Sequence, residues 1–100
     1  MAQYNKLVRD KIPKILDAKG VSYEKRIVEG EEYKKALIAK LHEELAEFTE
    51  AGAVEEFADI LEVVEALKVL PEYVDVETVR KAKCEERGGF AGGIVLTGEK

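Results

Sequence analysis

The chain has 100 residues and a formal net charge of −5, with 46% hydrophobic and 37% charged residues. This length suits one domain, residues 1–100, and the composition is typical of a globular, helix-rich protein. The negative charge argues against a nucleic-acid partner, and the lack of roughly 18–20 consecutive apolar residues argues against a membrane partner. Cys84 is the single cysteine, so we expect no internal disulfide and a cytoplasmic, reducing location.

The first quarter of the sequence predicts one helix and one short strand. Apolar residues recur at helical spacing over residues 5–19, and Gly20 marks the end of this helix. Pro13 lies inside the range, so a short turn is expected before the regular part of the helix. Residues 21–28 alternate loosely and include β-branched and aromatic residues, which favours a strand.

Two longer helices are predicted in the centre of the chain, over residues 31–51 and 53–70. The first range contains no glycine or proline, Gly52 separates the two helices, and Pro71 ends the second. Each helix carries an apolar stripe at helical spacing, made by Leu37, Leu41, Leu45 and Phe48 on the first and by Phe57, Ile60, Val63, Val64 and Leu67 on the second. Because the connection is so short, the helices should pack as an antiparallel hairpin.

The last third of the chain predicts one more helix and then a flexible turn. Residues 75–87 suit a helix, with Asp75 as a candidate N-cap and basic residues toward the C-terminus. The glycine-rich stretch RGGFAGG follows, and after it the apolar run IVLT. We therefore expect a mostly α-helical fold, in which residues 21–28 and 93–98 either pair as a small two-stranded sheet or remain irregular.

Four acidic residues on the central helices form the most informative pattern. They are two pairs with a three-residue step, so each pair shares a helix face: Glu44 with Glu47, and Glu56 with Asp59. At about 100° per residue they fall on the apolar stripes, or at the edge of the stripe for Glu47. Buried carboxylates are costly unless they are paired or bound to metal, and in a hairpin the two pairs would meet near Gly52. The pattern indicates a site for a hard divalent cation, and the alternative is a solvated acidic face.

The acidic motifs, EELAE at 43–47 and EFAD at 56–59, read EExxE and ExxD. This pattern resembles the all-α nucleoside triphosphate pyrophosphohydrolases, which include MazG, the dimeric dUTPases and phosphoribosyl-ATP pyrophosphohydrolase. Both ends of the chain are similar to a short single-domain branch of that group, through YNKLVRDKIP at 4–13 and KxxxRGGFxG at 83–92. The resemblance implies a MazG-like helical hairpin bundle whose catalytic residues and ligands for Mg²⁺, or for Mn²⁺, are Glu44, Glu47, Glu56 and Asp59.

The implied reaction is hydrolysis of a nucleoside triphosphate to the monophosphate and pyrophosphate, and one role would be the removal of non-canonical nucleotides. The resemblance places the attack of water at the α-phosphorus, with Glu44 or Glu47 as general base instead of direct ligand. Only eight residues separate Glu47 from Glu56, which leaves few residues there to recognise a nucleobase. Hydrolysis of phosphoribosyl-ATP is the nearest alternative, and a non-catalytic helical interaction module is an alternative of another class.

Basic residues at both ends are the candidates for binding substrate phosphates, because Mg²⁺ alone cannot neutralise a triphosphate. These candidates are Lys6, Arg9, Lys11, Lys83 and Arg87. For Lys83 and Arg87 the alternative is a favourable charge at a helix C-terminus. Apolar residues outside the main stripes, Ala36, Ile38 and Leu61, predict a homo-oligomer, either a dimer or a tetramer.

Overall fold

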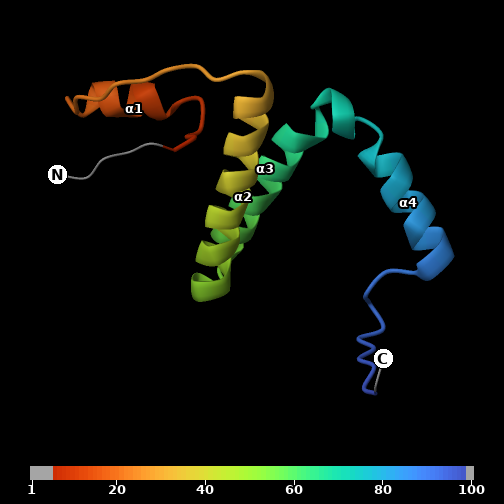
Figure 1. The fold of residues 1–100 in the computed structure, drawn as a ribbon. Helices are drawn as coiled ribbons and strands as arrows, with labels where there is room; N and C mark the ends of the chain where they lie inside the picture. Colours follow the sequence, from red (N-terminus) through yellow and green to blue (C-terminus); the bar gives the residue numbers. More distant parts are fainter. Residues whose placement is uncertain (1–5, 99–100) are drawn as a thin grey trace.

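The chain folds into helices joined by irregular segments, as seen in the computed structural model, which describes residues 6–98 (Figure 1). The first two residues of the N-terminal motif, Tyr4 and Asn5, lie outside the described residues. Over the described range the elements are α1 (Ile12–Ala18), α2 (Gly30–Ala51), α3 (Val54–Lys68), the 3₁₀-helix η1 (Pro71–Tyr73) and α4 (Val76–Arg87). The prediction of a mostly α-helical fold is confirmed.

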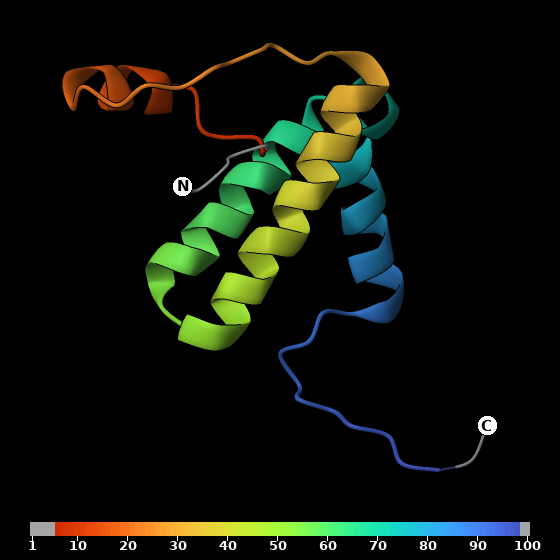
Figure 2. The ribbon, with the colours of Figure 1, turned by 60° about the vertical axis from the view of Figure 1, so that its left-hand side comes forward.

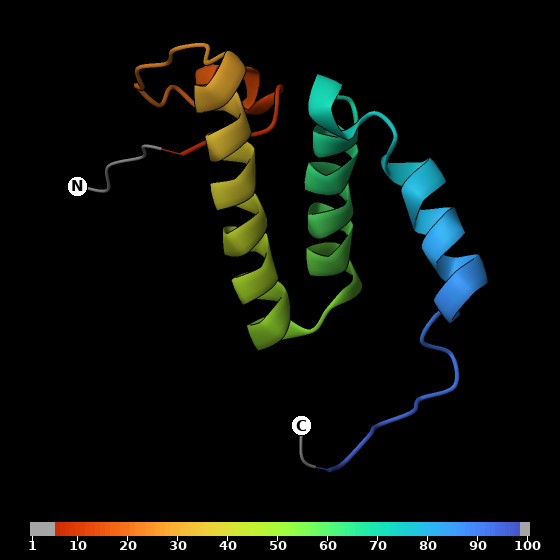
Figure 3. The same cartoon turned by 45° about the vertical axis from the view of Figure 1, so that its right-hand side comes forward.

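The centre of the structure is a helical hairpin formed by α2 and α3. The two helices run side by side in opposite directions, and they make the main tertiary packing of the described residues (Figures 1 and 3). Gly52 follows α2 with φ at 65°, a left-handed conformation that favours glycine, and its N–H donates to the Phe48 carbonyl at 2.8 Å. This cap ends α2 and reverses the chain, so the predicted hairpin forms around the predicted glycine.

The seam between α2 and α3 buries few side chains. Leu37 on α2 and Val63 on α3 are the buried apolar residues of the described chain, at 3% and 8% exposure. The rings of Phe48 and Phe57 contact each other near the Gly52 end, with centroids 5.5 Å apart. Glu44 is buried in the same seam, although it is charged. The core is therefore a narrow line of contacts rather than a filled interior.

The N-terminal helix is shorter than the sequence predicts. The prediction of a helix over residues 5–19 is wrong for its first half, because α1 begins only at Ile12 and residues 7–9 are irregular. Pro13 lies in the first turn of α1, where its missing N–H removes no helical hydrogen bond. The proline thus sets the start of the helix and leaves the preceding residues free to cross the hairpin.

Of the two alternatives for residues 21–28 and 93–98, the irregular one is confirmed and the small sheet does not form, since no strand occurs in residues 6–98. The first segment leads from α1 into α2 at one end of the hairpin, whereas the second follows α4 and extends away from it (Figures 1 and 2). A strand needs a neighbouring edge to satisfy its N–H and C=O groups, and these two segments are too far apart to supply one. Both remain irregular and mostly exposed.

The chain as a whole is open. Its radius of gyration is 17.9 Å, against about 13 Å for a compact chain of this length. Its accessible surface is 9148 Å², whereas a compact protein of 11.2 kDa exposes roughly 5,700 Å². Among residues 6–98, no helix combines the length and apolar character needed to cross a lipid bilayer.

Candidate functional site

Glu44 is the most unusual side chain of the hairpin. It is 5% exposed, and its Oε1 lies 3.1 Å from the Nζ of Lys40, one helical turn earlier on α2. Its Oε2 is buried and has no hydrogen-bond partner, alone among the side-chain atoms of residues 6–98. An unpaired buried acceptor costs about 1–3 kcal/mol, and more when it is charged. This oxygen is therefore a strong candidate to bind a cation.

Glu47 follows Glu44 by less than one turn on α2 and is exposed. The pKa of Glu47 is raised, first by the negative charge of Glu44 and then by a hydrogen bond between the two carboxyl groups. The two side chains therefore repel when both are ionised. A cation shared by the two carboxylates would relieve this repulsion.

Asp59 on α3 is held by a residue from far away in the sequence. The Nη2 of Arg9 donates to Asp59 Oδ1 at 2.6 Å, and the Nη1 of Arg9 lies 3.8 Å from Glu62 Oε1. Asp59 is partly exposed, with 38% of its side-chain surface accessible. Glu56, one turn earlier on α3, is half-buried. The inward placement predicted for Glu56 and Asp59 is thus only partial.

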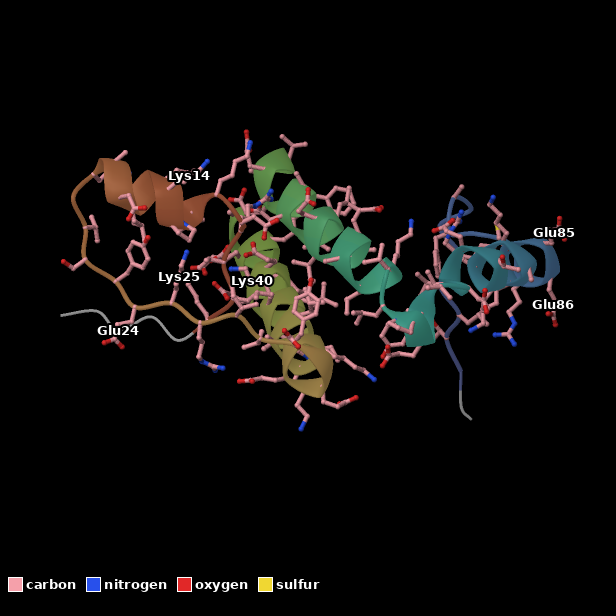
Figure 4. All side chains as sticks on the ribbon, turned by 90° about the horizontal axis from the view of Figure 1, so that it is seen from above. Lys14, Glu24, Lys25, Lys40, Glu85 and Glu86 are labelled. Carbon is pink, nitrogen blue, oxygen red and sulfur yellow. The ribbon has the colours of Figure 1, made fainter. Side chains whose placement is uncertain are left out.

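We call residues 6–11 the strap, because they pass across one side of the hairpin before α1 begins. Besides the pair of Arg9 with Asp59, the Nζ of Lys6 donates to Glu43 Oε1 at 3.0 Å. This hydrogen bond is the main cause that lowers the pKa of Glu43. Lys40 lies between the hairpin and the N-terminal segment, whereas Glu85 and Glu86 project from the far end of α4 (Figure 4). Cations from the strap and α2 therefore lie directly on the acidic side of the hairpin.

The strap, α2 and α3 enclose a cleft of about 410 Å³. This volume falls within the range of small-molecule sites in proteins. The charged side chains lining the cleft are Arg9, Asp10, Lys11, Lys40, Glu44, Asp59 and Glu62. The cleft thus brings together one predicted ligand from each central helix and two of the predicted phosphate-binding residues.

The four predicted carboxylates are not gathered into one cluster. Within residues 6–98, no three acidic, histidine or cysteine side chains are close enough to hold a metal ion together. Glu44 and Asp59 line the cleft, whereas Glu47 and Glu56 do not. Lys40 and Arg9 offset the charge of Glu44 and Asp59.

The two predicted phosphate-binding residues of the C-terminal region lie away from the cleft. Lys83 and Arg87 are exposed on α4, and neither lines the cleft. The helix ends at Gly88, whose N–H donates to the Cys84 carbonyl at 2.8 Å. In a single subunit, their position agrees with the alternative of a charge near the helix C-terminus.

Sequence reasoning missed the role of Lys40. Lysine and glutamate four residues apart on a helix face each other, so the spacing from Lys40 to Glu44 could have identified this pair. The contact between Arg9 and Asp59 spans 50 residues, and no local pattern could have revealed it. No protein-family model, curated protein or solved structure matches the chain. Its function is therefore inferred from the residues of the cleft.

Proposed function

We propose that this protein is a Mg²⁺-dependent nucleoside triphosphate pyrophosphohydrolase, which splits its substrate into the nucleoside monophosphate and pyrophosphate. The observation that supports this most is the unpartnered Oε2 of Glu44, buried in a cleft that also holds Asp59, Arg9 and Lys11. Acidic residues can bind a divalent cation and basic residues can bind phosphates. A cleft that holds both therefore suits a complex of a triphosphate with its cation better than a triphosphate or a cation by itself.

The donor set fits magnesium. Carboxylate oxygens are the protein ligands that Mg²⁺ prefers, and the ion usually keeps several waters and takes phosphate oxygens from the substrate. Glu44 and Asp59, which line the cleft, would hold the ion there, and the resemblance adds Glu47 and Glu56, which do not line it. Mn²⁺ accepts the same ligands. When bound, the ion supplies charge neutralisation of the phosphates and a lower pKa of the attacking water.

Residues of the chain itself would orient the substrate and move the proton. Arg9 and Lys11 line the cleft and can bind phosphate oxygens, Arg9 in bidentate fashion. Glu47 is one candidate for general base, because it is exposed to water beside Glu44. It would accept a proton as water attacks the α-phosphorus, the bond to the bridging oxygen breaks, and pyrophosphate leaves. Glu44 is the alternative base.

A homo-oligomer, at least a dimer, is part of the proposal. The surface of 9148 Å² exceeds that of a compact chain by more than half, so much apolar area lacks cover. Large apolar side chains are exposed on one side of the hairpin, which we call the apolar face: Ile38, Leu45, Val54, Phe57 and Leu61. Helical rotation turns these residues away from Lys40 and Asp59. A second copy covering this face would leave the cleft open.

The test is a screen for pyrophosphate release. Purified protein with Mg²⁺ is given canonical and damaged nucleoside triphosphates and phosphoribosyl-ATP, and pyrophosphate is measured over time. Turnover of at least one nucleotide, lost in Glu44→Gln but kept in Glu50→Gln, supports the proposal, because Glu50 is an exposed residue of the same helix. Turnover confined to phosphoribosyl-ATP would assign that substrate. No turnover, together with no Mg²⁺ binding by calorimetry, would favour the interaction module.

A further inference from the structure

Arg9 lies at an oxygen that the proposed function needs for a metal ion. Its Nη2 is 2.6 Å from Asp59 Oδ1, and its Nη1 is 3.8 Å from Glu62 Oε1. A guanidinium at this distance uses the carboxylate oxygen as its acceptor. A divalent cation bound to the same oxygen would be repelled by the positive charge of Arg9. Binding of the ion to Oδ1 of Asp59 therefore requires Arg9 to move.

The strap that carries Arg9 is bordered by open space. Space lies on both of its sides, the cleft of about 410 Å³ and a second cavity of about 680 Å³, and both are lined by Leu7, Val8, Arg9 and Asp10. The ion pair is also well exposed, with 54% of the Arg9 side chain accessible and 38% of that of Asp59. Solvent-exposed ion pairs of this kind are weak, so a divalent cation can compete with them.

We propose that the strap responds to binding of a divalent cation. Arg9 neutralises Asp59 in the metal-free protein, and it is released when the cation binds to Asp59. The released guanidinium stays tethered at the mouth of the cleft, where the phosphates of the substrate would lie. It then exchanges a carboxylate partner for a phosphate partner, and both suit its planar fork. Glu44 needs no such exchange at its buried Oε2, which has no partner to displace.

This inference rests on the proposed function, since it assigns a role to Arg9 at the same metal site. The two events are linked: if the ion weakens the pairing of Arg9 with Asp59, this pairing must weaken binding of the ion by the same factor. The native chain should therefore bind Mg²⁺ less tightly than a chain in which Arg9 cannot pair with Asp59.

The first experiment measures Mg²⁺ affinity by calorimetry on the full chain without nucleotide. We expect Arg9→Gln to bind Mg²⁺ about three- to tenfold more tightly than the native protein, the range of a partly exposed ion pair. Lys14→Gln is the matched control, because Lys14 is exposed on α1 and lies outside the cleft. Equal affinity of Arg9→Gln and the native protein would overturn the strap proposal and leave the proposed function intact. No binding by any variant would overturn both.

The second experiment measures the position of the strap. Spin labels are attached at Asp10→Cys on the strap and Glu55→Cys on α3, with Cys84→Ser removing the native thiol, which is exposed. We expect a narrow distance distribution in the metal-free protein and a broader or longer one with saturating Mg²⁺. Asp59→Asn in the labelled protein should give the broad distribution without any metal. A narrow distribution in Asp59→Asn would overturn the proposal, whatever the affinity for Mg²⁺. Thermal unfolding of each variant identifies any loss of fold.

Discussion

Lys40 lies 3.1 Å from the buried carboxylate of Glu44 and 3.5 Å from that of Glu43, so one ammonium group serves two acids on the same helix. Lys40 itself is largely covered, with 16% of its side chain accessible. It satisfies one oxygen of Glu44 and leaves the other unpaired. The arrangement keeps a buried charge in place without completing its coordination, which distinguishes Glu44 from the surface acids of α2.

The first prediction concerns Glu44, whose carboxylate is buried and only partly paired. We expect Glu44→Gln to reduce pyrophosphate release about a hundredfold or more, because it removes a charged oxygen from the site. The melting temperature should stay unchanged or rise, since the variant no longer buries an incompletely paired charge. Steady-state kinetics and thermal unfolding of the same protein test this. A lower melting temperature with native turnover would assign Glu44 to the fold instead.

Glu56 provides a separate test of the resemblance. Glu56→Gln is expected to abolish hydrolysis while the protein remains folded, although Glu56 does not line the cleft in the single subunit. Calorimetry should show weaker Mg²⁺ binding. Native turnover of this variant at saturating Mg²⁺ would limit the site to Glu44 and Asp59, with Glu47 as the remaining candidate.

A third prediction concerns Arg87, which lies outside the cleft of its own subunit. If it binds phosphate, it must do so in the site of a partner subunit, and Arg87→Ala should lower kcat/KM about tenfold to a hundredfold. Mixing Arg87→Ala subunits with Glu44→Gln subunits should then restore activity, to about a quarter of the native value for randomly mixed dimers. The absence of recovery, with a lowered melting temperature of Arg87→Ala, would assign Arg87 to the end of α4.

The oligomer can be tested through the apolar face. Light scattering of the native chain at micromolar concentration should give the mass of a dimer or a larger assembly. Leu61→Glu should shift the protein toward monomer, because a charge cannot be buried in an apolar contact without a large cost. Val69→Glu is the control, since Val69 is exposed but lies outside the apolar face. A native chain that is strictly monomeric would contradict the prediction.

The attachment of α4 should depend on pH. Glu77 on α4 pairs with Arg80 at 2.9 Å and with Lys68 of α3 at 3.4 Å, and its pKa is lowered, first by the hydrogen bond from Arg80. A carboxyl group whose pKa is lower in the folded state stabilises it above the unfolded pKa, about 4.3, and this contribution disappears as the pH falls through the folded pKa.

Accordingly, Glu77→Gln should melt about 1–3 °C below the native protein at pH 7, and the two should melt together at pH 3. Glu85→Gln is a suitable control, because Glu85 projects from the exposed end of the same helix (Figure 4). A difference that persists unchanged at pH 3 would show that the loss has another cause than the charge of Glu77.

The hairpin could be predicted from the sequence because its determinants are local. The apolar stripes place Leu37 and Val63 in the seam, Gly52 reverses the chain, and helical rotation correctly predicts that Glu44 is buried. The sequence left the choice between a small sheet and irregular segments open, because the apolar and β-branched composition of residues 21–28 and 93–98 does not reveal whether a partner edge is near.

The cleft could be predicted only in part. Glu44 and Asp59 were identified by spacing, but the path of the strap depends on ion pairs between residues far apart in the chain. Nothing within the N-terminal segment indicates that Arg9 meets Asp59 instead of a substrate phosphate, since both are anions with similar geometry. Joint binding of one metal ion by all four carboxylates remains a prediction.

The narrow seam of α2 and α3 also affects how this protein must be handled. Folding orders every residue at a cost in conformational entropy, and two buried apolar side chains recover little of it. In the proposed oligomer, most of the folding free energy would be gained only on association, so the unfolding midpoint should rise with total protein concentration. Dilution to nanomolar levels would lower the folded fraction, and specific activity measured there would understate that of the concentrated protein.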